Sequence, residues 1–217
     1  LKANGTVAMT IAGDARALPI GDGAIDLIVT SPPYANAIDY MRAHKFSLVW
    51  LGKSIPELSE LRSKYIGSER IGHMPADSLP NRPQTIIQQL RQRDNKKASI
   101  LLKYLNEMKS VLSEMYRVLR QNSPAIVVVG TSVMRGLDVQ THHCLADIAV
   151  ERGFDVIKVV QRTLDRNKRM MPARFQKSRD SMIEQRMHEE YVIGLLKPEH
   201  TEDTSKGTRK FAVKRQY

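Results

Sequence analysis

The sequence is poor in residues that would support several common kinds of protein chemistry. Its 217 residues include one cysteine, Cys144, so an internal disulfide is impossible and a reducing compartment is predicted. No apolar run approaches the length of a membrane span, and the first residues lack the hydrophobic core of a signal peptide. We therefore expect a soluble, cytoplasmic protein.

The few histidines and the single cysteine do not form a metal-binding pattern. His142 and His143 are adjacent, and adjacent positions on a helix diverge by about 100°. No further cluster of ligand residues accompanies them, so we predict no metal. Cys144 lies in the same stretch, THHCLADIA, and is interpreted as a structural helix residue rather than a nucleophile.

Acidic residues are scarce relative to basic ones. The chain has 34 Lys and Arg against 23 Asp and Glu, a formal net charge of +11 and a pI near 9.8. A polyanionic partner is the natural interpretation, and nucleic acid is the commonest such partner. A solvated basic surface is the alternative.

Apolar runs alternate with helical patterns along the chain. Leucine and methionine recur at three- and four-residue spacing over 98–120, which predicts a long amphipathic helix. Further helices are predicted over 38–51, just before 97, and over 138–152, where Asp138 could cap the start and Gly153 the end. Strands are predicted at 7–12, 25–30, 125–130, 154–160 and 191–196.

This order predicts an α/β fold, a Rossmann-like sheet that is mainly parallel with helices on both faces. We expect one domain over 1–198, in which 35–97 is an insertion and a candidate target-recognition segment. The polar residues 199–217 are predicted to form a flexible tail.

The tetrapeptide Ser31-Pro32-Pro33-Tyr34 follows the second predicted strand directly. In such sheets, ligands bind beyond the carboxyl ends of the strands. Two prolines fix the backbone and offer carbonyl acceptors without N–H donors, while Ser31 adds a hydroxyl and Tyr34 a flat ring. These groups suit a planar ring with an amino group, such as a flipped nucleobase. The alternative is an ordinary turn after a strand.

The stretch GDARALPIGDGAIDLIVTSPPY resembles two motifs of the S-adenosylmethionine-dependent DNA methyltransferases that act on exocyclic amino groups. Later stretches, VVVGTSVMRG, LADIAVERGFDVIKVVQRT and EEYVIGLLKP, resemble further motifs of the same family, so the similarity touches most of 6–198. The resemblance implies that Ser31, Pro32, Pro33 and Tyr34 are catalytic. Serine at the first position favours cytosine N4 over adenine N6 as the target.

The resemblance also implies a cofactor, S-adenosyl-L-methionine. Gly13, Asp14, Ala15 and Arg16 would line its adenine pocket, and Asp14 would contact the adenine amino group. Capping of the next turn is the alternative role for Asp14.

One family feature is absent from this sequence. The glycine-rich turn that lets the backbone approach the methionine part of the cofactor has no counterpart, and 21–23 lies too close to Asp14 to serve. The chain therefore resembles the target-base half of a methyltransferase that lacks the first two strands. The cofactor half is expected in an upstream segment or on a second chain.

Basic residues mark two candidate nucleic-acid contacts. The segment 161–179, QRTLDRNKRMMPARFQKSR, holds seven basic residues and one acidic residue, and a solvated loop is its alternative role. The insertion is the second candidate. The residues expected to contact DNA are Arg162, Lys168, Arg169 and Arg174 in the first segment, and Arg42, His44 and Lys45 in the second.

Two other functions stay open from the sequence. Guanine-N2 methyltransferases of tRNA carry a similar PPY-type motif, although they usually add an RNA-binding domain that is not seen here. A nucleic-acid-binding subunit that has lost catalysis with its cofactor half is the other.

Overall fold

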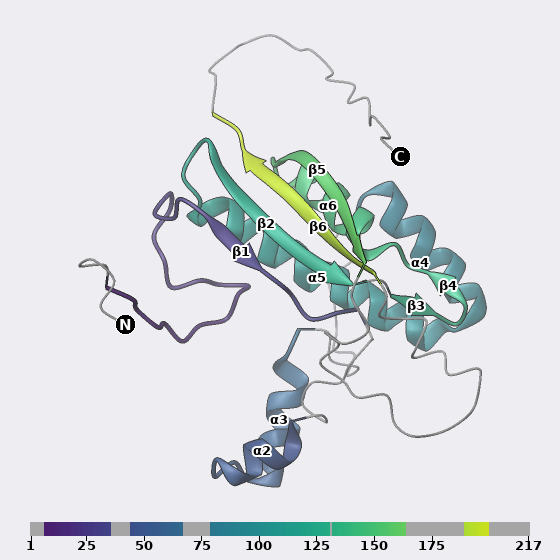
Figure 1. The fold of residues 1–217 in the computed structure, drawn as a ribbon. Helices are drawn as coiled ribbons and strands as arrows, with labels where there is room; N and C mark the ends of the chain where they lie inside the picture. Colours follow the sequence, from purple (N-terminus) through teal and green to yellow (C-terminus); the bar gives the residue numbers. More distant parts are fainter. Residues whose placement is uncertain (1–6, 36–43, 67–78, 131, 164–188, 200–217) are drawn as a thin grey trace.

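The computed structural model describes residues 7–35, 44–66, 79–130, 132–163 and 189–199 (Figure 1). Its centre is a four-stranded sheet in the order β1–β2–β6–β5. The strands span Ile28–Thr30 (β1), Ser123–Gly130 (β2), Asp155–Thr163 (β5) and Glu189–Lys197 (β6). β1 and β2 are parallel, and β6 runs antiparallel to both β2 and β5. Three strands thus share one direction, which confirms the α/β class.

The long helix predicted over 98–120 is α5 (Asn95–Val118). All six of the periodic residues that predicted it are buried; they are Leu101, Leu105, Met108, Leu112, Met115 and Leu119. The Asp94 carboxylate caps its start by accepting from the Lys97 backbone N–H at 3.0 Å. Helix α5 therefore forms the centre of the core that covers the sheet.

Two more helices complete this layer. Helix α4 (Asn81–Arg93) packs on α5 through Ile86, Ile87 and Leu90, so this part of 35–97 belongs to the core. Helix α6 (Thr141–Glu151) packs against α5 and the sheet. Gly153 follows it with a φ of 101°, as predicted for the residue that ends this helix.

The start of α6 differs from the prediction. Asp138 was expected to cap this helix, but it lies in β4 (Leu137–Asp138), which pairs with β3 (Val133–Met134) in a small hairpin. The N-cap is Gln140, in the left-handed region, and Asp138 accepts from its backbone N–H at 2.9 Å. The sequence could not show this hairpin because each of its strands has two residues.

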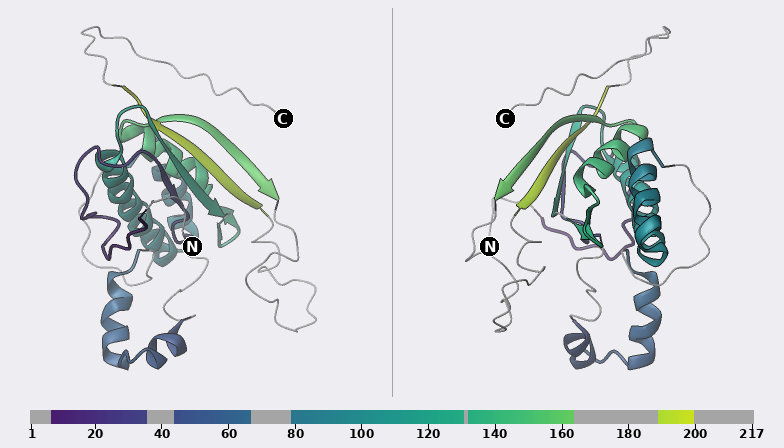
Figure 2. Two further views of the ribbon diagram at one scale, coloured as in Figure 1. Left: turned by 60° about the vertical axis from the view of Figure 1, so that its left-hand side comes forward. Right: turned by 90° about the vertical axis from the view of Figure 1, so that its right-hand side faces the viewer.

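Helices α2 (Lys45–Trp50) and α3 (Ile55–Lys64) stand away from the sheet (Figures 1 and 2). A capping box of Ser54 and Glu57 starts α3. The helix predicted over 38–51 is represented by the shorter α2, since 36–43 lie outside the described residues. Phe46 and Trp50 of α2 are 86% and 94% exposed.

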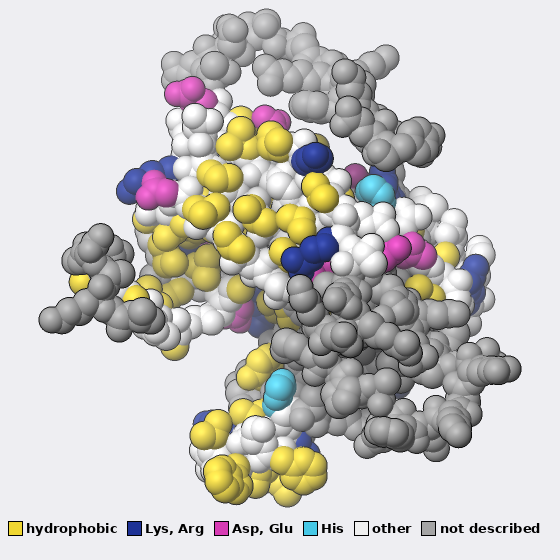
Figure 3. Space-filling view, viewed as in Figure 1, with side chains coloured by type: hydrophobic (Ala, Val, Ile, Leu, Met, Phe, Trp, Pro, Cys, Tyr) yellow, Lys and Arg dark blue, Asp and Glu magenta, His cyan; other side chains and the backbone are white. Residues whose placement is uncertain are grey.

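The two faces of the sheet are covered very differently. Helices α4, α5 and α6 all lie on one face, and the described residues place no helix on the other (Figure 2). That helix-free face is apolar (Figure 3). Val29 on β1 and Val160 on β5 alternate with residues that face the core, so they point to the helix-free face. They are 64% and 41% exposed. The second helical layer that we expected is therefore absent from the described part of the chain.

The strand predicted over 7–12 does not form. Residues 7–13 have no regular structure, and Val7 and Met9 are 85% and 80% exposed. The apolar pattern indicated a buried parallel strand, but such a strand needs neighbours on both sides. The described residues provide no strand in the places expected beside it, so the segment has nothing to pair with.

No helix in the described ranges is both long enough and apolar enough to cross a membrane.

Candidate active site

The tetrapeptide Ser31–Tyr34 lies where the sequence predicted it, directly after β1 at the carboxyl edge of the sheet. Pro32 is buried, whereas Ser31 is exposed to solvent. The proline therefore anchors the loop in the protein while the serine remains accessible. Thr30, the last residue of β1, is level with Val127 of β2, so the loop lies beside the last residues of that strand.

A buried hydrogen bond fixes the end of this loop. Ser132, which is 3% exposed, donates its hydroxyl to the backbone oxygen of Ala35 at 2.9 Å. A buried carbonyl needs such a partner, because an unpaired one costs roughly 1 to 3 kcal/mol. The loop after β1 is therefore held at the residue that follows the tetrapeptide.

The ring of Tyr34 lies against the end of β2. A methyl group added to Gly130 would lie 2.9 Å from Cε2 of the ring, closer than real side chains approach. The Tyr34 hydroxyl donates to Oε1 of Glu190 on β6 at 3.0 Å. The ring is thus held at its edge by strand β2 and at its hydroxyl by strand β6.

Glu190 belongs to a row of residues that crosses three strands. It is level with Gly130 on β2 and with Arg162 on β5. Its Oε2 accepts from the Arg162 guanidinium, and the two side chains form an ion pair. Residues that oppose one another in this way share one face of the sheet. By alternation along β2, this is the helix-free face.

The Gly13–Arg16 turn lies against α5 rather than at the end of a strand. The Asp14 carboxylate accepts from the Arg16 backbone N–H at 2.9 Å and from its guanidinium at 2.7 Å. These hydrogen bonds hold the pKa of Asp14 below its usual value. Arg16 also reaches Glu107 of α5 at 3.1 Å. In this arrangement both oxygens of Asp14 are engaged by Arg16.

The predicted DNA contacts fall mostly outside the described residues. Those outside are Arg42, Lys168, Arg169 and Arg174. His44 and Lys45 lie at the start of α2 and are exposed, and Arg162 lies on β5 beside Glu190.

The residues that we excluded from chemistry are largely buried in α6. Cys144 is 1% exposed and donates its thiol to the Val139 oxygen at 3.4 Å, while burial raises its pKa to about 12. His142 stacks on Tyr191 of β6 with 3.5 Å between ring centroids. Burial lowers the pKa of His142 to about 4. An inert thiol and a neutral imidazole both fit a structural role.

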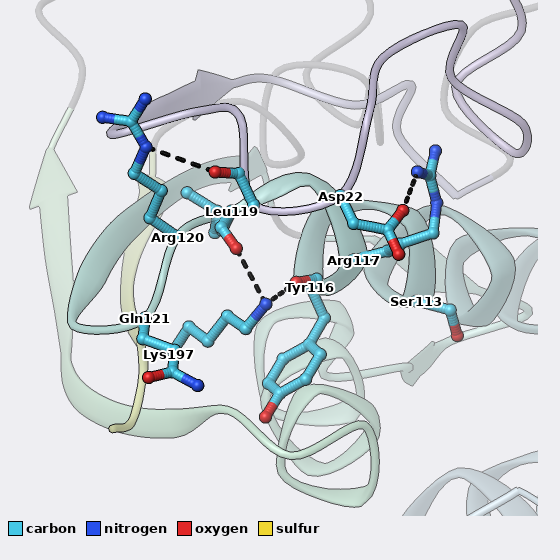
Figure 4. A pocket seen from close by; sticks show the side chains of 9 residues that line it. Asp22, Ser113, Tyr116, Arg117, Leu119, Arg120, Gln121 and Lys197 are labelled. Carbon is cyan, nitrogen blue, oxygen red and sulfur yellow. Dashed lines mark hydrogen bonds and ion pairs between the residues drawn. The ribbon is translucent and has the colours of Figure 1, made fainter. Parts of the chain in front are cut away.

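A hollow at the opposite, amino edge of the sheet also contains charged residues (Figure 4). Its cations are engaged within the protein. Lys197 donates to the last carbonyls of α5, at 2.8 Å to Tyr116 and 2.7 Å to Leu119. Arg117 pairs with Glu114 at 2.7 Å. Lys197 thus ties β6 to the end of α5, and the hollow lies at the far end of the strands from Tyr34.

Three residues around Tyr34 were not singled out from the sequence. Gly130 ends the apolar run AIVVVG, where a glycine could have suggested close approach of another group. Glu190 and Ser132 carried no comparable signal, because each depends on contacts between segments far apart in the sequence.

The family model and the relatives that match this chain are those of DNA methylases and type II methyltransferases. The family model of N6/N4 methyltransferases, described as DNA methylase, matches residues 25–215. The type II methyltransferase M.AvaI of Nostoc sp. is 29% identical over 153 residues, which is 62% of this chain and 32% of that protein. M.BsoBI of Geobacillus stearothermophilus is 44% identical over 48 residues, covering 22% of this chain and 9% of that protein.

A solved structure that aligns with this chain comes from Thermus thermophilus. It is titled as a putative DNA modification methylase in complex with S-adenosyl-L-methionine, is 17% identical and has a TM-score of 0.44. The alignment covers 89% of this chain and 57% of that one. The chain thus spans about a third of the length of M.AvaI and little more than half of this structure.

Proposed function

Because the chain belongs to the N6/N4 DNA methylase family, we propose that it is the target-base part of a DNA methyltransferase. The proposed enzyme transfers a methyl group from S-adenosyl-L-methionine to an exocyclic amino group, with cytosine N4 as the first choice. The observation that carries this proposal is the Ser31–Tyr34 loop at the carboxyl edge of the sheet, with Tyr34 held by β2 and β6.

The roles proposed for the loop follow from its chemistry. The exocyclic nitrogen of cytosine is a poor nucleophile because its lone pair is delocalised into the ring. The Ser31 hydroxyl and the Pro32 carbonyl would accept its two hydrogens and favour a pyramidal nitrogen with an available lone pair. Tyr34 would stack on the flipped base. Serine, rather than aspartate or asparagine, at the first position of the tetrapeptide supports cytosine as the target.

S-adenosyl-L-methionine would supply an electrophilic methyl group. We propose that Gly13, Asp14, Ala15 and Arg16 form the chain's own part of its adenine pocket. The turn does not fit this role as it stands, since the Asp14 carboxylate is engaged by Arg16. Binding would therefore require the turn to change its hydrogen bonds.

We further propose that another polypeptide segment completes the fold and carries the glycine-rich cofactor turn. Three observations support this: the exposed apolar residues within 7–13, the helix-free apolar face of the sheet, and the fact that M.AvaI is about three times longer than the matched part. An apolar sheet face of this kind normally lies under a helical layer. The segment could belong to the same gene or to a second chain.

The DNA contacts are proposed from charge. Lys168, Arg169 and Arg174 follow the end of β5 and precede the start of β6, and both of these strand ends lie at the edge beside Tyr34. His44 and Lys45 lie at the start of the projecting pair α2 and α3, and Arg42 precedes them in the sequence. Both groups would contact phosphates, and the projecting helices are the proposed target-recognition element.

One experiment tests this function. The complete protein is incubated with methyl-labelled S-adenosyl-L-methionine and either DNA or tRNA, and the nucleic acid is digested to nucleosides. We expect label in N4-methylcytosine. Label in N6-methyladenine would change the target base, label in guanine of tRNA would replace DNA by RNA, and no transfer at all would leave a non-catalytic subunit.

A further inference from the structure

We propose that Glu190 is a positioning residue that fixes the ring of Tyr34, and that Arg162 in turn fixes Glu190. Strands β5 and β6 would thereby set the angle of the surface on which the target base stacks. This inference rests on the proposed function, because it assumes that Tyr34 meets the base.

Two of the contacts made by Tyr34 restrain the orientation of its ring. A tyrosine side chain has two main rotatable bonds, and a contact at one point leaves one of them free. Gly130 has no side chain, so the edge of the ring can lie directly against the backbone of β2. Glu190 accepts a hydrogen bond from the Tyr34 hydroxyl at 3.0 Å. Contacts at the ring edge and at the far hydroxyl together restrict both rotations.

The Glu190 carboxylate divides its two oxygens between two partners. Oε1 accepts from Tyr34, and Oε2 accepts from Arg162. The Glu190 side chain is 14% exposed and that of Arg162 is 59% exposed. An ion pair with so exposed a partner adds little stability. Its effect is instead to orient the carboxylate, so that Oε1 points to the tyrosine.

The cross-strand register makes this arrangement possible. Gly130, Glu190 and Arg162 are directly opposite one another on β2, β6 and β5. Glu189 and Tyr191 alternate with Glu190 and point to the opposite, helix-covered face, where Tyr191 stacks on His142. The row is thus specific to one face, and the adjacent Glu189 provides a matched control.

This arrangement gives Arg162 a different role from the one predicted for it from charge alone. A phosphate contact would contribute to the salt dependence of DNA affinity. A residue that orients Glu190 would instead affect turnover. The two roles are separable, because loss of Arg162 changes a different measured quantity in each case.

The test is a double-mutant cycle on the complete protein, with Tyr34→Phe, Glu190→Ala and the double variant, and with Glu189→Gln as control. We expect each single change to lower kcat about tenfold with KM for DNA within about twofold, and the double variant to match the singles. Glu190→Gln keeps an acceptor and should recover part of the loss. Normal kcat in Glu190→Ala, or additive losses in the double variant, would overturn the proposal.

Melting temperatures of the wild type, the two single variants and the double variant separate this inference from the proposed function. Loss of the hydrogen bond should lower the melting temperature by about 3 °C in either single variant, with no further fall in the double variant. Coupled melting temperatures in a protein that transfers no methyl group would refute the function and keep the Tyr34–Glu190 contact. Methyl transfer by the wild type, together with additive changes in melting temperature, would support the function and refute the Tyr34–Glu190 contact.

Discussion

Both faces of the central sheet are apolar, but the described residues cover only one of them with helices. On one face, α4, α5 and α6 bury Val127, Val129 and Ile193 to 1% exposure or less. On the other face, alternating residues of the sheet, such as Val29 and Val160, stay in contact with solvent. A strand that is apolar on both faces is suited to burial on both. Within the described residues, only one of these two faces is covered, which is consistent with the proposal that a further segment packs on the other.

The candidate active site lies on the uncovered side of this division. Tyr34, Glu190 and Arg162 occupy the helix-free face at the carboxyl edge. At the amino edge, by contrast, Lys197 ties β6 to the end of α5. The helix-free face thus combines an apolar surface with the polar side chains that hold Tyr34.

The largest expected effect separates the two faces by stability. Leu105→Ala on the covered side should cost about 2 to 5 kcal/mol, because it leaves a cavity in a fully buried site. Val29→Thr on the open side should stay within about 0.5 kcal/mol in this chain. Chemical denaturation measures both. In the complete protein, Val29→Thr should cost about 1 to 3 kcal/mol if a helical layer covers it, and an unchanged value would mean that the face stays open.

The next effect concerns the loop after β1. Ser31→Ala and Tyr34→Ala should lower turnover of the complete enzyme about a hundredfold, or roughly 2 to 4 kcal/mol, because they remove groups that act on the base in the transition state. The fold should survive, since Ser31 is exposed. Steady-state kinetics and circular dichroism give the two readings. Near-normal turnover in both variants would remove the tetrapeptide from catalysis.

A pH effect is expected from the covered face. Burial and the nearby charges of His143 and Arg82 lower the pKa of His142 from 6.5 to about 4. The folded state therefore resists protonation of His142. The contribution of this residue to the free energy of unfolding is complete above pH 6.5 and is lost as the pH falls toward 4. The difference corresponds to about 3 kcal/mol at the acid end.

His142→Phe keeps the stacking on Tyr191 but removes the titration, so its unfolding free energy should vary less between pH 6.5 and 4. Unfolding curves across this range, with Asp147→Asn as a control for the neighbouring carboxylate that pairs with Arg82, provide the comparison. An identical slope in wild type and His142→Phe would contradict the assignment.

The smallest effect concerns DNA affinity. Neutralising Lys168, Arg169 and Arg174 should weaken binding to all sequences alike and reduce the salt slope by about 0.9 for each phosphate contact. Arg162→Gln should leave that slope unchanged, because its guanidinium serves Glu190. Binding isotherms at several salt concentrations measure both. A smaller salt slope for Arg162→Gln would mean that Arg162 contacts a phosphate.

The sequence predicted what depends on local pattern. The spacing of Leu101 to Leu119 predicted α5, and the prolines after β1 indicated a rigid loop at a strand end. It could not predict the β2–β6 register that brings Glu190 to Tyr34, because that depends on pairing across about sixty residues. The prediction of a strand over 7–12 was wrong for a related reason. Its pattern indicated burial, but the described residues hold no partner strand for it.

The most direct test of the whole account is calorimetry of S-adenosyl-L-methionine binding to residues 1–217 alone and to the complete protein. If the cofactor pocket needs another segment, this chain alone should bind the molecule weakly or not at all and should tend to associate through its open face. The complete protein should bind it stoichiometrically. Stoichiometric micromolar binding by a monomer of residues 1–217 would contradict the account, because it would show that the pocket is already complete.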